Sequence, residues 1–497
     1  MYERWCEMLT IEEIELFIQE DAASEKKMFA RKGQAYYEGE HDIKNYRLFY
    51  YNADGELVED TTRSNIKICH PFMTELVDQG TQFILSGSDG IFKSDIPELQ
   101  AELDTYFNYD EDFLAELSEL LTGGQNKGFE YMFAHKNAQD RTTFQCADSL
   151  GVIEVRAKDT DTKAEHYIYH YIDRIDKGRK TIKRIQVWDD KVVEFFVQGS
   201  DGKIERDSSE PINPRPHTLY KKEGDNATYY KDEKGFIPFF RFDMNKKQFG
   251  LLKTVKALID DYDLMACGLS NNIQDSAEYT VVVSGFQGDN LDELIQNIKT
   301  KRHIGTDTDG GIDFKTVDIP YEARKVKLEL DEKNIYRFGM GLNTSGLKDT
   351  SATTNIAIKA AYSLLELRCS KIEIKLKQFL RKLVNIVLQE INELNGTDYQ
   401  QKDVYFEFEH EIMSNELENA QVRQLEAQEQ QLRINTLLSL ATQLDNETVM
   451  QNICDVLEID YEEIKGKLPN PNEAGDELNN AQSVLDGVPV EGDPVNA

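Results

Sequence analysis

Three stretches of this sequence carry residue types whose spacing could support chemistry. The first is the glycine-rich run 339–346, in which Gly341 and Gly346 have the spacing of a loop that wraps phosphate groups. Such a loop needs a lysine directly after its second glycine, but Leu347 displaces this lysine to Lys348. No apolar strand precedes the run, so the structural surroundings of a phosphate loop are missing as well. We therefore predict no nucleotide site here.

The second stretch has three aspartates that could bind a cation. Asp307, Asp309 and Asp313 are similar in type and order to the acidic ligands of a calcium-binding loop. However, Gly311 offers no side-chain ligand, and Ile312 stands where that loop needs glycine. The interpretation we favour is a turn over residues 307–311 at the tip of a hairpin. A metal-dependent nuclease or other DNA-processing enzyme stays an alternative that rests on these aspartates alone.

The third stretch contains two histidines, His166 and His170, which share a face whether the segment is helical or extended. Their neighbours are aromatic residues typical of a strand, and no third metal ligand is close in sequence. The sequence also lacks a Gly-x-Ser-x-Gly elbow and a His-Glu-x-x-His pair. We therefore predict no catalytic residues, no metal site and no cofactor, and hence a protein that is not an enzyme.

Length and charge narrow the class of protein further. The chain has 497 residues, more than the roughly 250–300 that one hydrophobic core supports, so several structural units are expected. Its 40% hydrophobic and 10% aromatic residues are ordinary for a folded protein. Against 57 lysines and arginines stand 91 aspartates and glutamates, which gives a net charge of −34. Such a surplus argues against adhesive binding to nucleic acid or to an anionic membrane.

The six cysteines lie far apart, with neither a Cys-x-x-Cys pair nor the spacing of a disulfide framework. They are typical of thiols in a reducing compartment. No stretch approaches the ~18 apolar residues that a membrane span needs. Residues 1–20 are too acidic for a signal peptide. These features predict a protein of the cytosolic type that does not enter a membrane.

The periodicity of the apolar residues predicts the elements that carry these stretches. The first thirty residues are expected to be helical, with Thr10 as a cap, and a further helix begins at Pro71. Residues 92–125 have helical spacing, which Gly123-Gly124 is expected to end. Between about 130 and 242 the period changes to two, which predicts an antiparallel meander of strands.

A continuous apolar seam follows, with spacings of three and four residues that predict one long helix. Its members are Leu251, Val255, Leu258, Tyr262, Met265, Leu269 and Ile273. A compact insert with a strand at 280–283 and a small helix at 291–299 separates this helix from a second one at 321–338. The polar loop 339–354 comes directly after. This order favours a helical hairpin with a small module at one end and a mobile loop at the other, a shape that suits a subunit packed against copies of itself.

The last third of the chain is expected to be mainly helical. A long helix follows the loop, then a strand at 404–408 and a helical block at 416–467. No lysine or arginine occurs after Lys467, whereas acids, prolines and glycines do. The composition of this tail predicts disorder.

The order of these features resembles the portal protein family of tailed bacteriophages, specifically the portals of Bacillus phages with long non-contractile tails. Five elements between about residues 30 and 275 carry the resemblance: Tyr36-Tyr37-Glu38-Gly39, Asn65 to Gly87 with Pro71-Phe72, Gly235 to Phe240 with Asn245, Leu258-Ile259-Asp260-Asp261-Tyr262, and Ser270 to Asp275. The family's C-terminal glycine-x-x-serine-x-glutamate-threonine element is reduced here to Leu444–Thr448. The likeness extends to about residue 410.

The resemblance implies an α+β multi-domain portal fold. Its parts would be a mixed α/β wing with an N-terminal helix (1–245), a first stem helix (246–275), a small α/β clip (276–319), a second stem helix (320–338), a tunnel loop (339–354), a long wing helix with a strand (355–410), a helical crown (411–468) and a disordered acidic tail (469–497).

The resemblance also implies a function. Such proteins form a ring, usually a dodecamer, at one vertex of the virion capsid after assembly in the cytoplasm of the host bacterium. Double-stranded DNA passes through it without sequence-specific contacts during packaging and ejection. The clip would dock the terminase large subunit and then the head-completion adaptor, and the wing would meet scaffold and major capsid proteins. Another oligomeric connector of the virion, such as an adaptor, stays an alternative.

Two groups of residues would then touch DNA. The second stem helix carries five cations among four acids, so it could contact phosphates at intervals without holding them. These cations are Arg324, Lys325, Lys327, Lys333 and Arg337. The tunnel loop offers short polar groups on a glycine-rich hinge, namely Asn343, Thr344, Ser345 and Lys348. The strongly acidic remainder would repel DNA, which suits a conduit and excludes a clamp.

Overall fold

The computed structural model describes residues 8–61, 63–87, 90–137, 140–156, 163–175, 181–199, 201–217, 219–221, 228–230, 235–276, 280–286, 294, 306–315, 320–344, 355–410, 416–440, 446–457 and 461. The chain divides into two compact units. The first comprises residues 1–351 and 359–412, and the second comprises 352–358 and 413–497. The expected disordered tail lies outside the described residues.

Helices α1 (Ile11–Ala23) and α2 (Glu25–Tyr37) open the first unit. Thr10 caps α1 as expected, because its hydroxyl accepts from the backbone N–H of Glu13 while the Glu13 carboxylate accepts from that of Thr10. Ser24 separates the two helices and caps the second one. Ile14 of α1 is fully buried against strand residues, so the amphipathic pattern identified a true core face.

The expected antiparallel meander is confirmed and forms two sheets. The larger sheet has the order β10-β9-β8-β7-β6, with β11 also paired to β9. Its strands are β6 (Val152–Val155), β7 (His166–Ile175), β8 (Thr181–Trp188), β9 (Val192–Gln198), β10 (Ile204–Arg206) and β11 (Arg215–Pro216). The smaller sheet has the order β14-β4-β5, from β4 (Phe129–Lys136), β5 (Thr142–Ala147) and β14 (Phe239–Asp243). Phe129, Trp188 and Phe239 belong to one core cluster that draws on both sheets.

Four further antiparallel strand pairs are small. They are β1 (Phe49–Tyr51) with β2 (Leu57–Glu59), β12 (Leu219–Lys221) with β13 (Thr228–Tyr230), β15 (Thr280–Phe286) with β16 (Thr306–Lys315), and β3 (Phe92–Lys93) with β17 (Tyr405–Phe406). The strand expected at 404–408 is thus confirmed in a shorter form. Short helical turns lie at η1 (Asp42–Asn45), η2 (Asp104–Asn108) and η5 (Gln401–Asp403).

Helices α3 (Phe72–Leu85), α4 (Pro97–Leu103) and α5 (Glu111–Lys127) follow the N-terminal pair. The expectation that Gly123-Gly124 ends a helix is wrong, because both glycines lie inside α5. A Cβ atom at Gly123 would lie 2.0 Å from Oε2 of Glu130, and one at Gly124 would lie 2.8 Å from the Phe242 ring. The two glycines permit close packing, and α5 ends at Gly128, whose φ of 97° is left-handed.

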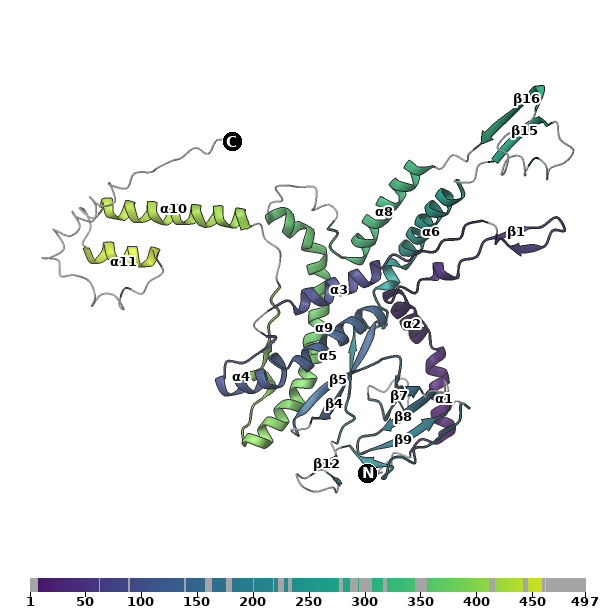
Figure 1. The fold of residues 1–497 in the computed structure, drawn as a ribbon. Helices are drawn as coiled ribbons and strands as arrows, with labels where there is room; N and C mark the ends of the chain where they lie inside the picture. Colours follow the sequence, from purple (N-terminus) through teal and green to yellow (C-terminus); the bar gives the residue numbers. More distant parts are fainter. Residues whose placement is uncertain are drawn as a thin grey trace. The chain divides into compact units, whose positions relative to one another are not determined.

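Helices α6 (Leu252–Ser276) and α8 (Tyr321–Gly339) run side by side in Figure 1. The strands β15 and β16 come between them in sequence, whereas the helix expected at 291–299 lies outside the described residues except for Leu294. Residues 307–311 belong to β16, so the turn expected there is wrong. Gly311 pairs with Ser284, and Asp309 and Asp313 are exposed. A solvent-exposed strand does not need alternating apolar residues. The polar and glycine-rich sequence of β16 therefore resembles that of a turn.

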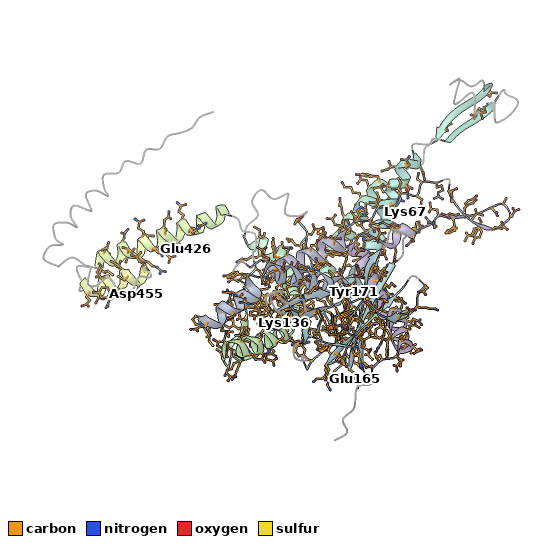
Figure 2. The ribbon with its side chains drawn as sticks, turned by 60° about the horizontal axis from the view of Figure 1, so that its bottom comes forward. Lys67, Lys136, Glu165, Tyr171, Glu426 and Asp455 are labelled. Carbon is orange, nitrogen blue, oxygen red and sulfur yellow. The ribbon has the colours of Figure 1, made fainter. Side chains whose placement is uncertain are left out.

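The long helix α9 (Asn355–Asn395) crosses the first unit in Figure 1, and its apolar face packs into the core through residues such as Leu376, Leu383 and Val387. Glu390 near its C-terminal end pairs with Lys136 of β4 at 2.7 Å, which ties α9 to the smaller sheet; Lys136 is labelled in Figure 2. The second unit contains α10 (Glu416–Leu440) and α11 (Asn446–Val456), which confirm the expected helical block in part.

Among the described residues, no helix is both long and apolar enough to cross a bilayer. The cysteines at 69, 146, 267, 369 and 454 are free thiols, in agreement with the expectation from their spacing.

Candidate functional site

The α6–α8 pair stands on a dense apolar base. Leu252, Val255 and Ile259 of α6 meet Ile335 of α8 in a cluster that also holds Leu76 of α3. These side chains have no solvent exposure. These contacts fix the N-terminal part of α6 and the C-terminal part of α8. The remaining parts of both helices therefore extend from a rigid support.

The predicted apolar seam of α6 lies partly on this base. Val255 is fully buried, and Leu251, Leu258 and Tyr262 are half-buried against the same cluster. Met265 and Leu269, further along, are also half-buried. The seam was predicted one turn too far, because its last member, Ile273, is 55% exposed. A second row of residues along α6 is buried. It begins with apolar side chains and ends with an aspartate and a cysteine: Leu252, Val255, Ile259, Asp263 and Cys267.

From Asp263 onward, every fourth residue of α6 accepts a hydrogen bond, and the acceptors in this row are Asp263, Cys267, Asn271 and Asp275. An extended segment, residues 64–70, lies along this row, and we call it the strap; Lys67, labelled in Figure 2, belongs to it. The bonds run from backbone N–H groups to side chains: Ser64 to Asp275 (3.1 Å), Ile66 to Asn271 (2.6 Å), Ile68 to the Cys267 sulfur (3.2 Å) and His70 to Asp263 (3.1 Å).

The register of the strap has a simple geometric cause. Two residues of extended chain advance by ~6.6 Å, and four residues of helix advance by ~6.0 Å. Alternate N–H groups of the strap therefore stay in step with acceptors one helical turn apart. Sequence reasoning missed this feature, although acceptors at 263, 267, 271 and 275 are visible in the sequence.

Asp263 is the most buried of these acceptors, with no solvent exposure of its side chain. Its oxygen atoms lie 2.5 Å from Nδ1 of His41 and 2.8 Å from Nδ1 of His70. Burial alone would raise the pKa of Asp263, but the hydrogen bonds from His41 and His70 outweigh it and lower the pKa below the usual range. The aspartate therefore holds His41, His70 and the end of the strap at one point of α6.

The five cations predicted on α8 separate into two groups. Arg324 and Lys327 face α6: Nη1 of Arg324 lies 3.5 Å from the carbonyl oxygen of Met265, and Lys327 pairs with Asp261 and Asp331. The bonds to these aspartates raise the pKa of Lys327.

Lys325, Lys333 and Arg337 are exposed and form no ion pair with the described residues. These three are available to a passing polyanion, whereas Arg324 and Lys327 are engaged within the subunit.

The first residues after α8 are held in place by close packing. A Cβ at Gly339 would lie 2.6 Å from a methyl group of Leu76, and one at Gly341 would lie 2.2 Å from the other methyl group. The Gln79 amide brackets Leu342, accepting from its N–H and donating to its carbonyl oxygen at 2.9 Å each. Gly339 is still part of α8, and Gly339 and Gly341 permit close approach to Leu76.

Of the predicted loop residues, Asn343 is half-buried with Nδ2 at 3.5 Å from the Glu332 carboxylate, and Thr344 is exposed. Ser345, Gly346 and Lys348 lie outside the described residues.

Arg368 of α9 secures the same region from the other side. Its guanidinium donates to the carbonyl oxygens of Gly339 (3.1 Å) and Leu76 (2.6 Å), and only 7% of the residue is exposed. The arginine thus joins three helices, α3, α8 and α9, where the predicted tunnel loop begins.

Comparison with known proteins identifies the family of the chain. A sequence profile of the family described as phage portal protein, SPP1 Gp6-like, matches residues 20–465. The chain belongs to this family. It is 27% identical over 351 residues to the portal protein of Bacillus phage SPP1, which covers 70% of this chain and 67% of the relative. It is 23% identical over 435 residues to the portal protein of Clostridium phage phiCD119, covering 83% and 89% respectively.

As a phage portal protein, the chain is a structural component of the virion and not an enzyme. The resemblance drawn from scattered sequence elements is confirmed. The two alternatives, an adaptor-type connector and a DNA-processing enzyme, are set aside by the family assignment.

The two histidines considered as metal ligands have core surroundings in this portal protein. His166 is buried, and burial lowers its pKa. Burial, together with the nearby charge of Lys27, lowers the pKa of His170 to about 4. Neither belongs to a metal-ligating group among the described residues.

Proposed function

We propose that this portal protein assembles into a dodecameric ring at one vertex of the capsid, through which double-stranded DNA enters during packaging and leaves at ejection. The family assignment supports this function, and one feature of the single chain supports the assembly in particular. That feature is the β1–β2 hairpin.

The β1–β2 hairpin carries large apolar side chains that its own subunit leaves in solvent. Tyr51 is 74% exposed, Leu57 59% and Phe49 55%. The turn between the strands is shaped locally, because the Asn52 side chain accepts from the N–H groups of Asp54 and Glu56. An isolated two-stranded hairpin is marginal in water, so an apolar hairpin of this kind needs cover from another body. In a protein of an oligomeric family, a neighbouring copy supplies that cover.

Imaging of the purified full chain by negative-stain microscopy, together with its native mass, tests the assembly. We expect rings for the wild type, and subunits or small oligomers for the double variant Tyr51→Asp, Leu57→Asp. Tyr109→Asp is the matched control, because Tyr109 is equally exposed at 75% but lies outside the hairpin. A wild type that stays without rings in all conditions contradicts the ring. Rings that form equally well with the hairpin variant contradict the role of the hairpin.

For the conduit, we propose that the exposed cations of α8 touch the DNA backbone transiently. Lys325, Lys333 and Arg337 stand on a helix with several acids, in a protein of net charge −34, so phosphates are attracted locally and repelled elsewhere. Such contacts position DNA without reading bases. Asn343, Thr344, Ser345 and Lys348 would supply further contacts from the tunnel loop.

For the remaining parts, we propose the domains that the resemblance to the family implies. Residues 276–319, including β15 and β16, would form the clip that docks the terminase large subunit and afterwards the head-completion adaptor. The N-terminal region to residue 245 and α9 would form the wing that meets scaffold and major capsid proteins during assembly in the host cytoplasm. The second unit, with α10 and α11, would form the crown.

A further inference from the structure

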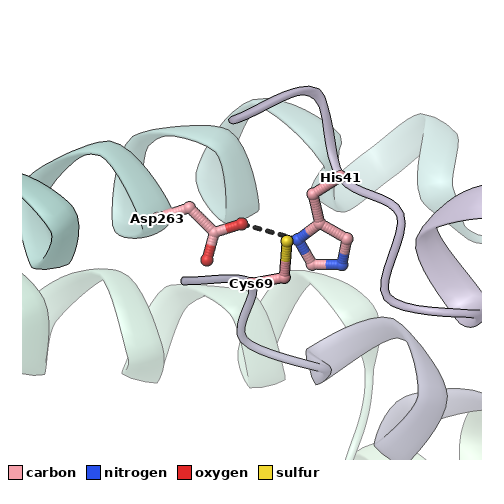
Figure 3. A group of neighbouring side chains, drawn as sticks. All are labelled: His41, Cys69 and Asp263. Carbon is pink, nitrogen blue, oxygen red and sulfur yellow. Dashed lines mark hydrogen bonds and ion pairs between the residues drawn. The ribbon is translucent and has the colours of Figure 1, made fainter. Parts of the chain in front are cut away.

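Three metal-ligating side chains converge where the strap meets α6 (Figure 3). His41 comes from the loop after α2, Cys69 from the strap and Asp263 from α6. One ligand atom of each, the His41 nitrogen, the Cys69 sulfur and an Asp263 oxygen, lies within 4.8 Å of the others. His41 and Asp263 are buried, and Cys69 is half-buried, so the cluster has one side within reach of solvent.

The hydrogen bonds of His41 show which ring nitrogen carries a hydrogen. Nε2 lies 3.2 Å from the carbonyl oxygen of Tyr36, which can only accept, so Nε2 must donate. The His41 ring also stacks on the Tyr36 ring, with centroids 4.5 Å apart, which fixes its orientation. Nδ1 is thereby directed at Asp263, as the dashed line in Figure 3 marks.

The contact between His41 and Asp263 is short and buried. Nδ1 of His41 and an oxygen of Asp263 lie 2.5 Å apart, and each atom has a lone pair that can bind a proton or a metal ion. Either a proton or a metal ion must therefore stand between them. A proton needs no third ligand, but Cys69 is held beside the pair because the residues on both sides of it, Ile68 and His70, are bonded to α6. The thiol favours the metal.

We propose that His41, Cys69 and Asp263 bind one divalent transition-metal ion of the Zn²⁺ type. Imidazole, thiolate and carboxylate are the ligands of Zn²⁺, whereas Mg²⁺ and Ca²⁺ select oxygen atoms. The bond from Nε2 of His41 to a backbone carbonyl is the outer contact that metal-bound histidines make. His70 supports the second oxygen of Asp263 in the same way, at 2.8 Å.

Three protein ligands leave the fourth position of a tetrahedral ion to a water molecule on the half-buried side of Cys69. In such a site, ligand atoms lie roughly 3.3–3.8 Å apart. The His41–Asp263 pair must therefore open slightly and Cys69 must approach. The bound ion would fasten the strap to α6 and to the loop after α2, and this property goes beyond the conduit function.

Titration of the full-length, reduced protein without an affinity tag tests the site, with Co²⁺ and Zn²⁺ as probes. We expect one Co²⁺ per subunit, with visible bands of tetrahedral Co²⁺ and a near-ultraviolet sulfur-to-cobalt charge-transfer band. Zn²⁺ should displace it. Cys69→Ser should abolish the charge-transfer band and weaken Zn²⁺ binding by at least ~10-fold. Cys454→Ser is the matched control and should change neither, because Cys454 lies in the second unit.

Two results would overturn the proposal. One is a wild-type protein that binds neither ion in a fixed ratio to subunits, which would assign the contact between His41 and Asp263 to a proton. The other is a Cys69→Ser protein whose spectrum and Zn²⁺ affinity equal those of the wild type. The first result decides the question without any variant, so a folding defect of Cys69→Ser cannot obscure the answer.

Discussion

Nη1 of Arg368 donates a hydrogen bond to the carbonyl oxygen of Gly339, the last residue of α8, at 3.1 Å. Burial lowers the pKa of Arg368, and its guanidinium donates to backbone carbonyl oxygens. The backbone carbonyls of Gly339 and Leu76 therefore supply its stabilisation. A buried cation placed at the C-terminal end of α8 also meets the negative end of that helix dipole.

Replacing Arg368 by leucine should destabilise the first unit. The change removes the hydrogen-bond donor of the Gly339 carbonyl oxygen at the end of α8. We therefore expect the free energy of unfolding to fall by about 2–4 kcal/mol. Denaturant titration followed by circular dichroism measures it. Arg381→Leu on the exposed face of α9 should change stability by no more than ~0.5 kcal/mol. Equal effects of the two variants would show that Arg368 does not hold the end of α8.

Gly341→Ala should cost about 1–3 kcal/mol, because the added methyl group enters the space of Leu76 and forces the packing apart. The decisive measurement is a double-mutant cycle. In a Leu76→Ala background the nearest neighbour of the added methyl is Oε1 of Gln79 at 3.1 Å, so the cost of Gly341→Ala should fall to less than half. An unchanged cost in that background would mean that the glycine is needed for another reason.

Asn271→Ala should release the middle of the strap. The Ile66 N–H loses its 2.6 Å bond to Asn271, so its hydrogen exchange should accelerate and stability should fall by about 1 kcal/mol. Exchange measured by mass spectrometry on peptides covering the strap reports the effect locally. Asn272→Ala is a control on the next residue of the same helix, whose side chain makes no hydrogen bond with the described residues. Equal exchange in both variants would argue against the strap.

His170 should make the first unit less stable in weak acid. Its pKa is lowered to about 4 by burial and by the charge of Lys27, against an ordinary value of 6.5. Between these values the unfolded chain binds a proton that the folded chain does not, so stability falls as the pH falls from 6.5 to 4. His170→Gln cannot titrate, and its melting temperature should fall less over this interval. Identical pH profiles for the two proteins would refute the contribution of His170.

The exposed cations of α8 should matter for DNA translocation and not for folding. Lys333→Glu with Arg337→Glu replaces two positive charges on each subunit by two negative ones, and we expect less DNA packaged per capsid with normal rings. Lys371→Glu, an exposed cation on α9, is the control. Packaging at the wild-type rate and length by the α8 variant would exclude these cations from DNA contact.

Much of the local structure could be predicted from the sequence. The seam from Leu251 to Leu269 identified α6, and Thr10 identified the start of α1, because helical periodicity and capping depend on residues only a few positions apart. The change to a period of two identified the sheets in the same way. Residues 307–311 and Gly123-Gly124 were mispredicted, since glycine and aspartate signal turns only when no partner strand or packed side chain uses them otherwise.

The sequence by itself therefore determined the helices, the strands and, through the order of its motifs, membership of the portal family. The tertiary structure decided which cations of α8 pair with the described residues, why Gly339 and Gly341 are glycines, and how the strap, Asp263 and Arg368 fix the α6–α8 pair. The physical reason is that these contacts join residues far apart in the chain, such as His41 with Asp263 and Gly339 with Arg368. Their energies arise from burial and hydrogen bonds that exist only after the chain has folded.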